Sequence, residues 1–159
     1  MASTVTASTL TVSLTESINL NGQEMGATNT KTIASINEIS KRIVTVTTAE
    51  AVIATFSSAV ASAGHYVAAN VRYVRFTNLD DSNFITLTFR NQDNDEVAIK
   101  LDAGQSFVWN GDNANGMTAV FNATQDADAA SDTAFGSLTN VQADANNNPC
   151  DLEIFVASV

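Results

Sequence analysis

Residues 71–109 read VRYVRFTNLDDSNFITLTFRNQDNDEVAIKLDAGQSFVW, and this stretch predicts four successive β-strands. Apolar residues alternate with polar ones over residues 85–90 and again over residues 97–101. Because side chains on a strand point alternately to its two faces, one set belongs to a core and the other to solvent. Asn, Asp, Gly and Ser, which suit turns, fill the segments between the runs. The stretch therefore specifies a scaffold and contains no catalytic constellation.

The rest of the chain has the composition of an all-β domain. Its length of 159 residues suits a single domain, and a hydrophobic fraction of 45% is enough for a core. Asn21-Gly22 is a typical hairpin turn, and short alternating or β-branched runs recur on both sides of it. We predict a single-domain antiparallel β-sandwich over residues 10–159, with jelly-roll connectivity ahead of a closed barrel. Further strands are expected at residues 10–14, 28–36, 42–48, 51–56, 118–122 and 152–156.

Three segments outside these runs carry separate expectations. Residues 48–63 fit either a helix, with a capping box at its start, or a strand followed by a loop, and the β-branched content favours the strand. Residues 123–148 hold few bulky side chains and are expected to form a long surface excursion. Met1–Thr9 is rich in Ser and Thr and is expected to be an extended, mobile N-terminal arm. Val5 and Leu10 could anchor it on a neighbouring subunit, and the equally favoured alternative is a frayed terminus without a role.

The predicted core takes one face of each strong strand, including the last strand after Pro149, the only proline. Its members are Val74, Phe76, Ile85, Leu87, Phe89, Val97, Ile99, Leu101, Phe107, Trp109, Ile154 and Val156.

Charge and cysteine content exclude several classes of protein. The net charge is −10, and all seven Lys and Arg residues lie between Lys31 and Lys100. Such a chain repels phosphate backbones and lacks a basic patch for anionic membranes, so neither nucleic acid nor membrane is an expected partner. A single cysteine, Cys150, excludes an intrachain disulfide. The first residues lack the features of a signal peptide, and we expect synthesis in a cytoplasm without a targeting signal.

Four groups of residues are candidates for functional sites, and for each a structural role is favoured over a functional one. His65 and Cys150 are single representatives of their types and form a catalytic dyad only if the fold brings them together. Two carboxylate clusters, with a weaker pair at Asp80-Asp81, invite comparison with calcium loops but lack the EF-hand pattern. Asn122-Ala123-Thr124 matches a glycosylation acceptor by chance, given the missing signal. The two carboxylate clusters are Asp93, Asp95 and Glu96, and Asp126, Asp128 and Asp132.

Aromatic residues supply the fourth group. Trp109 with Tyr73, Phe76 and Phe107 would suit a sugar-stacking platform, although aromatics at alternating strand positions more often belong to a core. The sequence thus predicts no catalytic, cofactor-binding or metal-binding residue, and no cofactor.

Five phrases of the sequence resemble small structural proteins in the virions of tailed bacteriophages. The likeness covers about residues 10–109 and consists of structural phrases rather than catalytic motifs. It implies a β-sandwich, oligomeric assembly and no enzymatic activity, and it assigns no functional residue. The phrases are Ser17–Gly22, Ile36–Ile39, Val71–Asp80, Asn83–Leu87 and Leu101–Phe107.

The resemblance points to a capsid decoration, or cement, protein located in the virion. Its expected partners are the major capsid protein or other virion proteins and further copies of itself, with a trimer favoured. The stretch Thr28–Thr48, rich in Thr, Ile and Val, suits a sheet edge that a neighbour completes. The alternatives are a neck, tail or fibre-base component and, in a different class, a carbohydrate-binding β-sandwich module.

Overall fold

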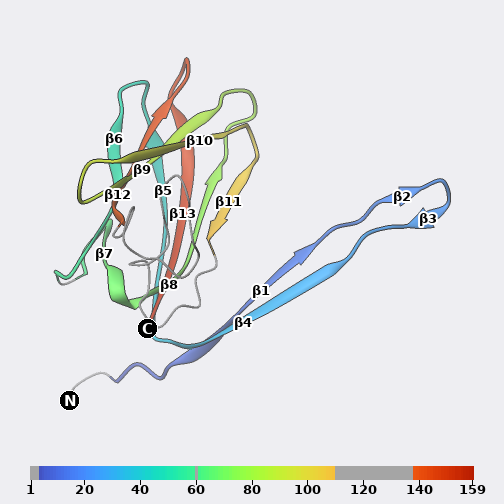
Figure 1. Ribbon diagram of the computed structural model, residues 1–159, viewed down its shortest axis with the longest axis horizontal. Helices are drawn as coiled ribbons and strands as arrows, with labels where there is room; N and C mark the ends of the chain where they lie inside the picture. The colour runs from blue at the N-terminus through green and yellow to red at the C-terminus, as the bar shows by residue number, and fades with distance from the viewer. Residues whose placement is uncertain (1–3, 60, 110–137) are drawn as a thin grey trace.

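The computed structural model describes residues 4–59, 61–109 and 138–159. Two β-sheets form a sandwich, and a long two-stranded ribbon projects from its lower end (Figure 1). One sheet has the strand order β10-β9-β12-β6-β7 and the other has the order β11-β8-β13-β5. The strands are β5 (Glu38–Val46), β6 (Ala51–Ser57), β7 (His65–Val67), β8 (Val71–Asn78), β9 (Ile85–Asn91), β10 (Glu96–Leu101), β11 (Ser106–Trp109), β12 (Leu138–Ala145) and β13 (Cys150–Ser158).

The core lies between the two sheets and takes side chains from both. Phe76 on β8 and Phe89 on β9 are fully buried and meet edge to face, with ring centroids 6.3 Å apart. Leu152, Ile154 and other inward residues of β13 pack in the same cluster. This arrangement confirms the predicted all-β sandwich; jelly-roll connectivity stays a prediction.

Eight of the twelve residues predicted for the core are buried, and three more are partly buried against it. Val97 was wrongly placed in the core, because its side chain is 39% exposed. β10 is the edge strand of its sheet, and burial falls from Leu101 at its C-terminal end to Val97 beside the β9–β10 turn. The buried eight are Val74, Phe76, Ile85, Leu87, Phe89, Leu101, Ile154 and Val156, and the partly buried three are Ile99, Phe107 and Trp109.

The expectation of a surface excursion over residues 123–148 is wrong for its C-terminal part. β12 lies at the centre of the five-stranded sheet, between β9 and β6. Its last two inward residues are small and lie beside large residues of β9: Ala143 pairs with Leu87, and Ala145 with Ile85. Complementary size, rather than bulk on both strands, fills this part of the core.

The segment 48–63 contains the strand that β-branched content favoured. β6 occupies residues 51–57 and pairs in parallel with the short β7. Its start carries no helix; the Thr47 hydroxyl instead donates to the Ala49 carbonyl at 3.1 Å in a tight turn. The strand expected at residues 118–122 lies outside the described residues.

The ribbon pairs β1 (Ser8–Thr15) with β4 (Thr28–Ile36), and its far end pairs β2 (Asn19–Leu20) with β3 (Gln23–Glu24). Its base packs on the sandwich, where Ile33 and Ile36 are buried against Tyr73 and Ala157. A β-bulge in β1 and a left-handed Ser35, with φ of 64°, bend the chain between ribbon and sandwich.

The ribbon uses residues that were expected to contact a neighbouring subunit. Strand β4, part of the stretch expected to offer an open edge to a neighbour, pairs with β1 of its own chain on one side and is an edge strand of that two-stranded sheet. β5, the other half of that stretch, pairs with β13 on one side and is the last strand of its sheet on the other. Leu10, named as an anchor on a neighbour, instead packs at the ribbon base of its own chain, whereas Val5 is exposed.

Candidate functional site

The outward face of the four-stranded sheet carries a charged network at its centre. Glu153 on β13 receives hydrogen bonds from Lys41 on β5, at 3.0 Å, and from Arg75 on β8. The hydrogen bond from Lys41 and then those from Arg75 hold the pKa of the Glu153 carboxyl below its usual value of 4.5. Arg75 also donates to the Thr77 hydroxyl at 2.6 Å. The network joins three strands across this face.

Next to this network the same face becomes apolar, and the ribbon base covers it. Tyr73 and Phe155 meet edge to face, with ring centroids 5.8 Å apart. Burial raises the pKa of the Tyr73 hydroxyl, and the charge of Arg75 opposes that shift. Leu10 and Val12 of β1 pack against this cluster. The ribbon is therefore attached to the sandwich by side-chain packing at its base.

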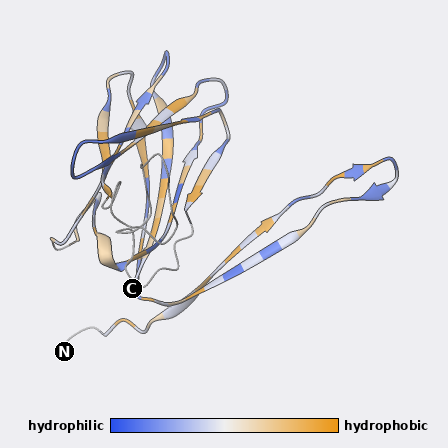
Figure 2. Ribbon diagram, viewed as in Figure 1, coloured by the Kyte–Doolittle hydropathy of each residue, from blue (hydrophilic) through white to orange (hydrophobic). Residues whose placement is uncertain are grey.

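Beyond Val12 the ribbon has one polar face and one apolar strip. Ser and Thr hydroxyls pair across it, with Ser13 3.2 Å from Thr30 and Thr15 3.2 Å from Thr28. Figure 2 shows apolar residues along β1 and more hydrophilic ones along β4. Leu14, on the apolar side, is 61% exposed.

The ribbon tip, residues 18–25, is a well-defined hairpin. Asn21 and Gly22 both have positive φ, 53° and 82°, as a type I′ turn requires, which confirms the predicted turn. The Glu24 carboxylate accepts hydrogen bonds from the amides of Gly26, at 2.8 Å, and of Ile18, at 3.2 Å. Three large apolar side chains on this tip, Ile18, Leu20 and Met25, are each more than half exposed.

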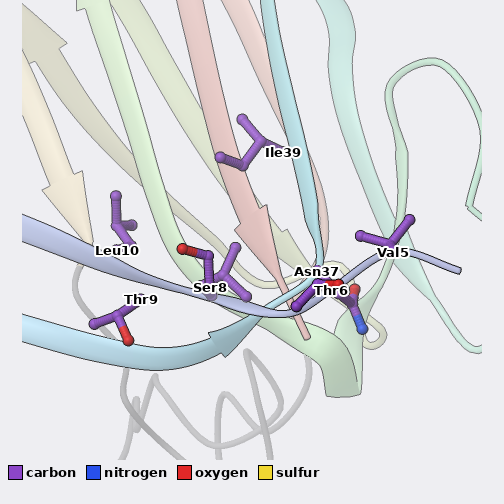
Figure 3. Close-up of a pocket in the computed structure, with 8 residues that line it drawn as sticks. Val5, Thr6, Ser8, Thr9, Leu10, Asn37 and Ile39 are labelled. Carbon is purple, nitrogen blue, oxygen red and sulfur yellow. The ribbon is translucent and has the colours of Figure 1, made fainter.

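An apolar groove lies at the opposite end of the ribbon, where the N-terminal segment passes the corner between β4 and β5 (Figure 3). Leu10, Ile36, Val5 and Ile39 supply its apolar lining, and Thr and Ser side chains complete it. Its volume is about 340 Å³. Val5 and Ile39 are each more than half exposed, so apolar surface here is open to solvent.

The structure does not bring His65 and Cys150 together. His65 lies beside Tyr66, whose hydroxyl is 3.2 Å from that of Ser40. Ser40 pairs with Val156, whereas Cys150 opens the same strand, β13, at its other end. Cys150 and Val156 are six residues apart on this strand and so about 20 Å from each other. A dyad between these residues is therefore excluded in this fold.

Each of the two residues has a structural role instead. His65 Nε2 lies 2.6 Å from the Ser57 hydroxyl, which itself accepts the Ala59 amide in a local turn. Cys150 is buried and donates its thiol to the Asn148 carbonyl. Burial, and then the nearby Asp80 carboxylate, raise the pKa of the Cys150 thiol, which disfavours the reactive thiolate.

At the β9–β10 turn, the carboxylate of Asp95 takes part in the turn and that of Glu96 in an ion pair. Asn91 organises the β9–β10 turn, accepting the amides of Asp93 and Asp95 and donating to the Asp95 carboxylate. Glu96 is paired with Arg90. Across residues 4–59, 61–109 and 138–159, no group of three or more His, Cys, Asp or Glu residues is placed to hold a metal ion. Asp126, Asp128, Asp132 and Asn122-Ala123-Thr124 lie outside the described residues.

Asp80 likewise stabilises a turn. Its carboxylate accepts the amides of Asn83, at 2.6 Å, and Ser82, at 2.8 Å. These backbone hydrogen bonds lower the pKa of Asp80. The buried Asn78 donates to the carbonyls of Asn83 and Leu101, so it fixes the same loop to the sandwich.

The four aromatic residues considered as a sugar platform divide between the two faces of one sheet. Phe76, Phe107 and Trp109 point into the core, where the last two contact Phe89 at centroid distances of 5.1 and 6.3 Å. Tyr73 lies on the outward face with Phe155. The structure thus assembles no platform from these four residues.

The sequence predicted the two strands and the turn of the ribbon, but not that they pair with each other and project from the sandwich, although the sequence holds that signal. Thr and Ser recur at every second position over residues 11–15 and 28–32, and the two runs are equally distant from Asn21-Gly22. The observed register follows that symmetry, pairing Thr11 with Thr32 and Thr15 with Thr28. The symmetry of these two runs about the turn therefore predicts that they pair with each other as one long hairpin.

Searches against protein-family models, curated proteins and solved structures found no match to this chain. Within the described part of the chain, no helix has the length and apolar character needed to span a membrane.

Proposed function

We propose that this protein is a non-enzymatic structural protein of a bacteriophage virion, most specifically a capsid decoration, or cement, protein that stabilises the shell. The observation that carries the proposal is the ribbon, a preformed hairpin that projects from the sandwich and exposes apolar residues at its tip. Beyond its base, which packs in the small cluster with Tyr73 and Ala157, this projection adds no buried side chain to the core among the described residues. It supplies a surface for association with other subunits.

The remainder of the structure supports the same proposal. The strongest sequence phrases form β8, β9 and the loop organised by Asn78 and Asp80, which are scaffold elements. Titratable groups with shifted pKa values lie in turns, in the core or in ion pairs. Many copies, each held by a modest interface, stabilise an assembled shell by mass action.

Under this proposal the protein is located in the virion and contacts the major capsid protein or other virion proteins. It forms a homo-oligomer, with a trimer favoured if it occupies threefold positions of a shell. Jelly-roll connectivity of the sandwich belongs to the same hypothesis. A neck, tail or fibre-base position is the alternative that the projecting ribbon also suits.

Immunogold labelling of particles tests the proposal. Antibodies raised against the purified protein are applied to particles released from cells that produce it, and the particles are imaged by electron microscopy. Label distributed over the shell is the expected result. Label confined to one vertex or to the tail would replace decoration by the neck or tail alternative, and absence from every particle would overturn the virion assignment.

A further inference from the structure

We propose that Asn21, at the ribbon tip, is a site of spontaneous deamidation and that the side chain of Asn19 controls the rate of this reaction. The site is the turn that joins β2 to β3. The proposal goes beyond the virion assignment and does not depend on it, because it concerns only the covalent chemistry of this turn.

The sequence makes Asn21 the asparagine most open to this reaction in the described part of the chain, because it is the one followed there by a glycine. Deamidation begins when the backbone nitrogen of the next residue attacks the side-chain carbonyl carbon. A side chain on that next residue hinders the approach, and Gly22 has none. Two more such pairs, Asn110-Gly111 and Asn115-Gly116, lie outside the described residues.

The reaction needs water as its single co-reactant. The Gly22 nitrogen forms a bond to Cγ of Asn21, the Cγ–Nδ2 bond breaks, and Nδ2 leaves as ammonia together with the hydrogen of the Gly22 amide. The product is a five-membered succinimide ring. Water then adds to one of the two ring carbonyls, and the ring opens to aspartate or to isoaspartate, in which the main chain runs through the side-chain carbon. Nothing is oxidised or reduced.

The closed turn keeps the two reacting atoms apart. Asn21 and Gly22 have φ of 53° and 82°, as in a type I′ turn. Such a turn holds ψ of its first central residue at about 30°. Ring closure instead requires the Asn21 Cβ to rotate into the plane of its own carbonyl, on the side of the Gly22 nitrogen. The attack therefore takes place only when the turn opens.

Asn19 holds the turn closed at the reacting nitrogen itself. Its Oδ1 accepts the Gly22 amide at 3.0 Å, and this amide hydrogen is the one that must leave. The carboxylate of Glu24 holds other amides of the tip, those of Ile18 and Gly26, so it does not replace Asn19. Loss of one such hydrogen bond corresponds to roughly a two- to tenfold increase in the open fraction of the turn.

Deamidation would change both the backbone and the charge of the tip. Asn19 pairs with Glu24 and Leu20 with Gln23, which leaves two residues for the turn. Isoaspartate adds a backbone carbon there, and the geometry of a two-residue turn is lost. Either product also adds a negative charge to a tip that already carries Glu24. The exposed apolar side chains around the turn are then presented differently.

Peptide mapping after incubation at mildly alkaline pH measures the reaction. Cleavage after glutamate releases residues 17–24 as one peptide, which separates Asn21 from the other two Asn-Gly pairs. Asn19→Ala is expected to accumulate aspartate and isoaspartate at position 21 roughly two to ten times faster than the wild type. Asn19→Asp retains an oxygen that accepts the Gly22 amide, so it is expected to react as slowly as the wild type.

Gln23→Ala is the matched control, because Gln23 also borders the turn but its side chain makes no hydrogen bond among the described residues. Its rate at Asn21 should equal that of the wild type. Equal rates in Asn19→Ala and the wild type, no reaction at Asn21 in any variant, or an Asn19→Asp variant as fast as Asn19→Ala would each overturn the proposal.

Hydrogen exchange separates opening of the turn from melting of the ribbon. In Asn19→Ala the amides of β1 and β4 are expected to exchange at the wild-type rate, because only the tip has lost a hydrogen bond. Faster exchange along both strands would assign the faster deamidation to a melted ribbon and would also overturn the role of Asn19.

Discussion

The sandwich and the ribbon are both made of antiparallel β-structure, but they differ in what stabilises them. In the sandwich, large side chains such as Phe76, Phe89 and Leu87 are fully enclosed between two sheets. In the ribbon, Ile33 and Ile36 are buried at the base and the side chains beyond Leu14 are open to solvent. Strand pairing alone therefore does not make a stable body, and burial on one face decides which part of the chain folds independently.

The difference also separates stability from association. A residue enclosed in the sandwich contributes to the free energy of unfolding of a single chain. An exposed residue on the ribbon contributes only when another surface covers it. Substitutions in the two regions should therefore have effects of different size and should appear in different measurements.

The largest expected effect is in the sandwich core. Leu87→Ala on β9 removes a fully buried side chain and leaves a cavity, so the free energy of unfolding should fall by about 2–5 kcal/mol. Val97→Ala is the matched control, since Val97 lies on the neighbouring β10 but is 39% exposed; its effect should stay below about 1 kcal/mol. Urea unfolding measures both. If both variants lost the same free energy of unfolding, Val97 would belong to the core after all.

A smaller effect is expected at the ribbon base. Ile33→Ala opens the packing that attaches the ribbon to Tyr73 and Ala157, at a cost of about 2 kcal/mol. The loss should appear as faster hydrogen exchange of amides in β1 and β4, because the ribbon detaches without unfolding the sandwich. Leu14→Ala, on the exposed part of the same ribbon, should leave those rates unchanged. A lower midpoint of the global transition would show that ribbon and sandwich unfold together.

The next effect concerns a cation between the two sheets. Arg42 on β5 donates to the Ile53 carbonyl of β6, and its guanidinium passes so close to Gly64 that a Cβ there would lie within 3 Å of it. Arg42→Met leaves that carbonyl without its charged donor but also removes the Arg42 Nε, which is buried without a partner among the described residues. Because these effects oppose each other, a net loss of about 1 kcal/mol is expected.

Thermal or urea unfolding of Arg42→Met measures that loss, and Lys41→Met is its control. Lys41 neighbours Arg42 on β5 but is largely exposed, so its removal should cost less. An Arg42→Met variant as stable as the wild type would show that apolar packing replaces the hydrogen bond completely.

The sequence predicted the sandwich well where burial follows a simple alternation. Ile85, Leu87 and Phe89 were assigned to the core from a period of two, and they are fully buried. Thr88 shows the limit of that rule: it lies on the opposite face of β9 and is still buried, because β10 and β12 flank this strand on both sides. Position within a sheet, which one strand's sequence does not contain, decides such cases.

The ribbon and β12 were missed for a related reason. The alanines of β12 carry little hydrophobic signal, and their burial depends on Leu87 and Ile85 lying opposite. β1 of the ribbon alternates Thr and Ser with apolar residues, as a half-buried strand of a sandwich does, although in the described part of the chain its side chains are covered at the ribbon base and exposed beyond it. For the candidate sites, the sequence identified residues that lack a catalytic or metal-binding motif around them. It could not identify the ribbon tip and the groove, because these depend on which apolar side chains the fold leaves exposed.

The smallest expected effect, which depends on pH, is on the outward face that lies between the two regions. Lys41 and Arg75 hold the pKa of Glu153 below its usual value of 4.5, so folding is stabilised by the ionised carboxylate. That stabilisation is complete above pH 4.5 and is lost as the pH falls through the lower pKa of the folded state.

Glu153→Gln should therefore reduce the free energy of unfolding by about 0.2–1 kcal/mol at pH 7, a range typical of partly exposed ion pairs. The difference from the wild type should shrink toward zero in more acidic solution and should also diminish at high salt, which screens the pairs. Urea unfolding of both proteins at pH 7 and at pH 3 measures it, and a difference that stays constant or grows as the pH falls would show that Glu153 acts through packing rather than through its charge.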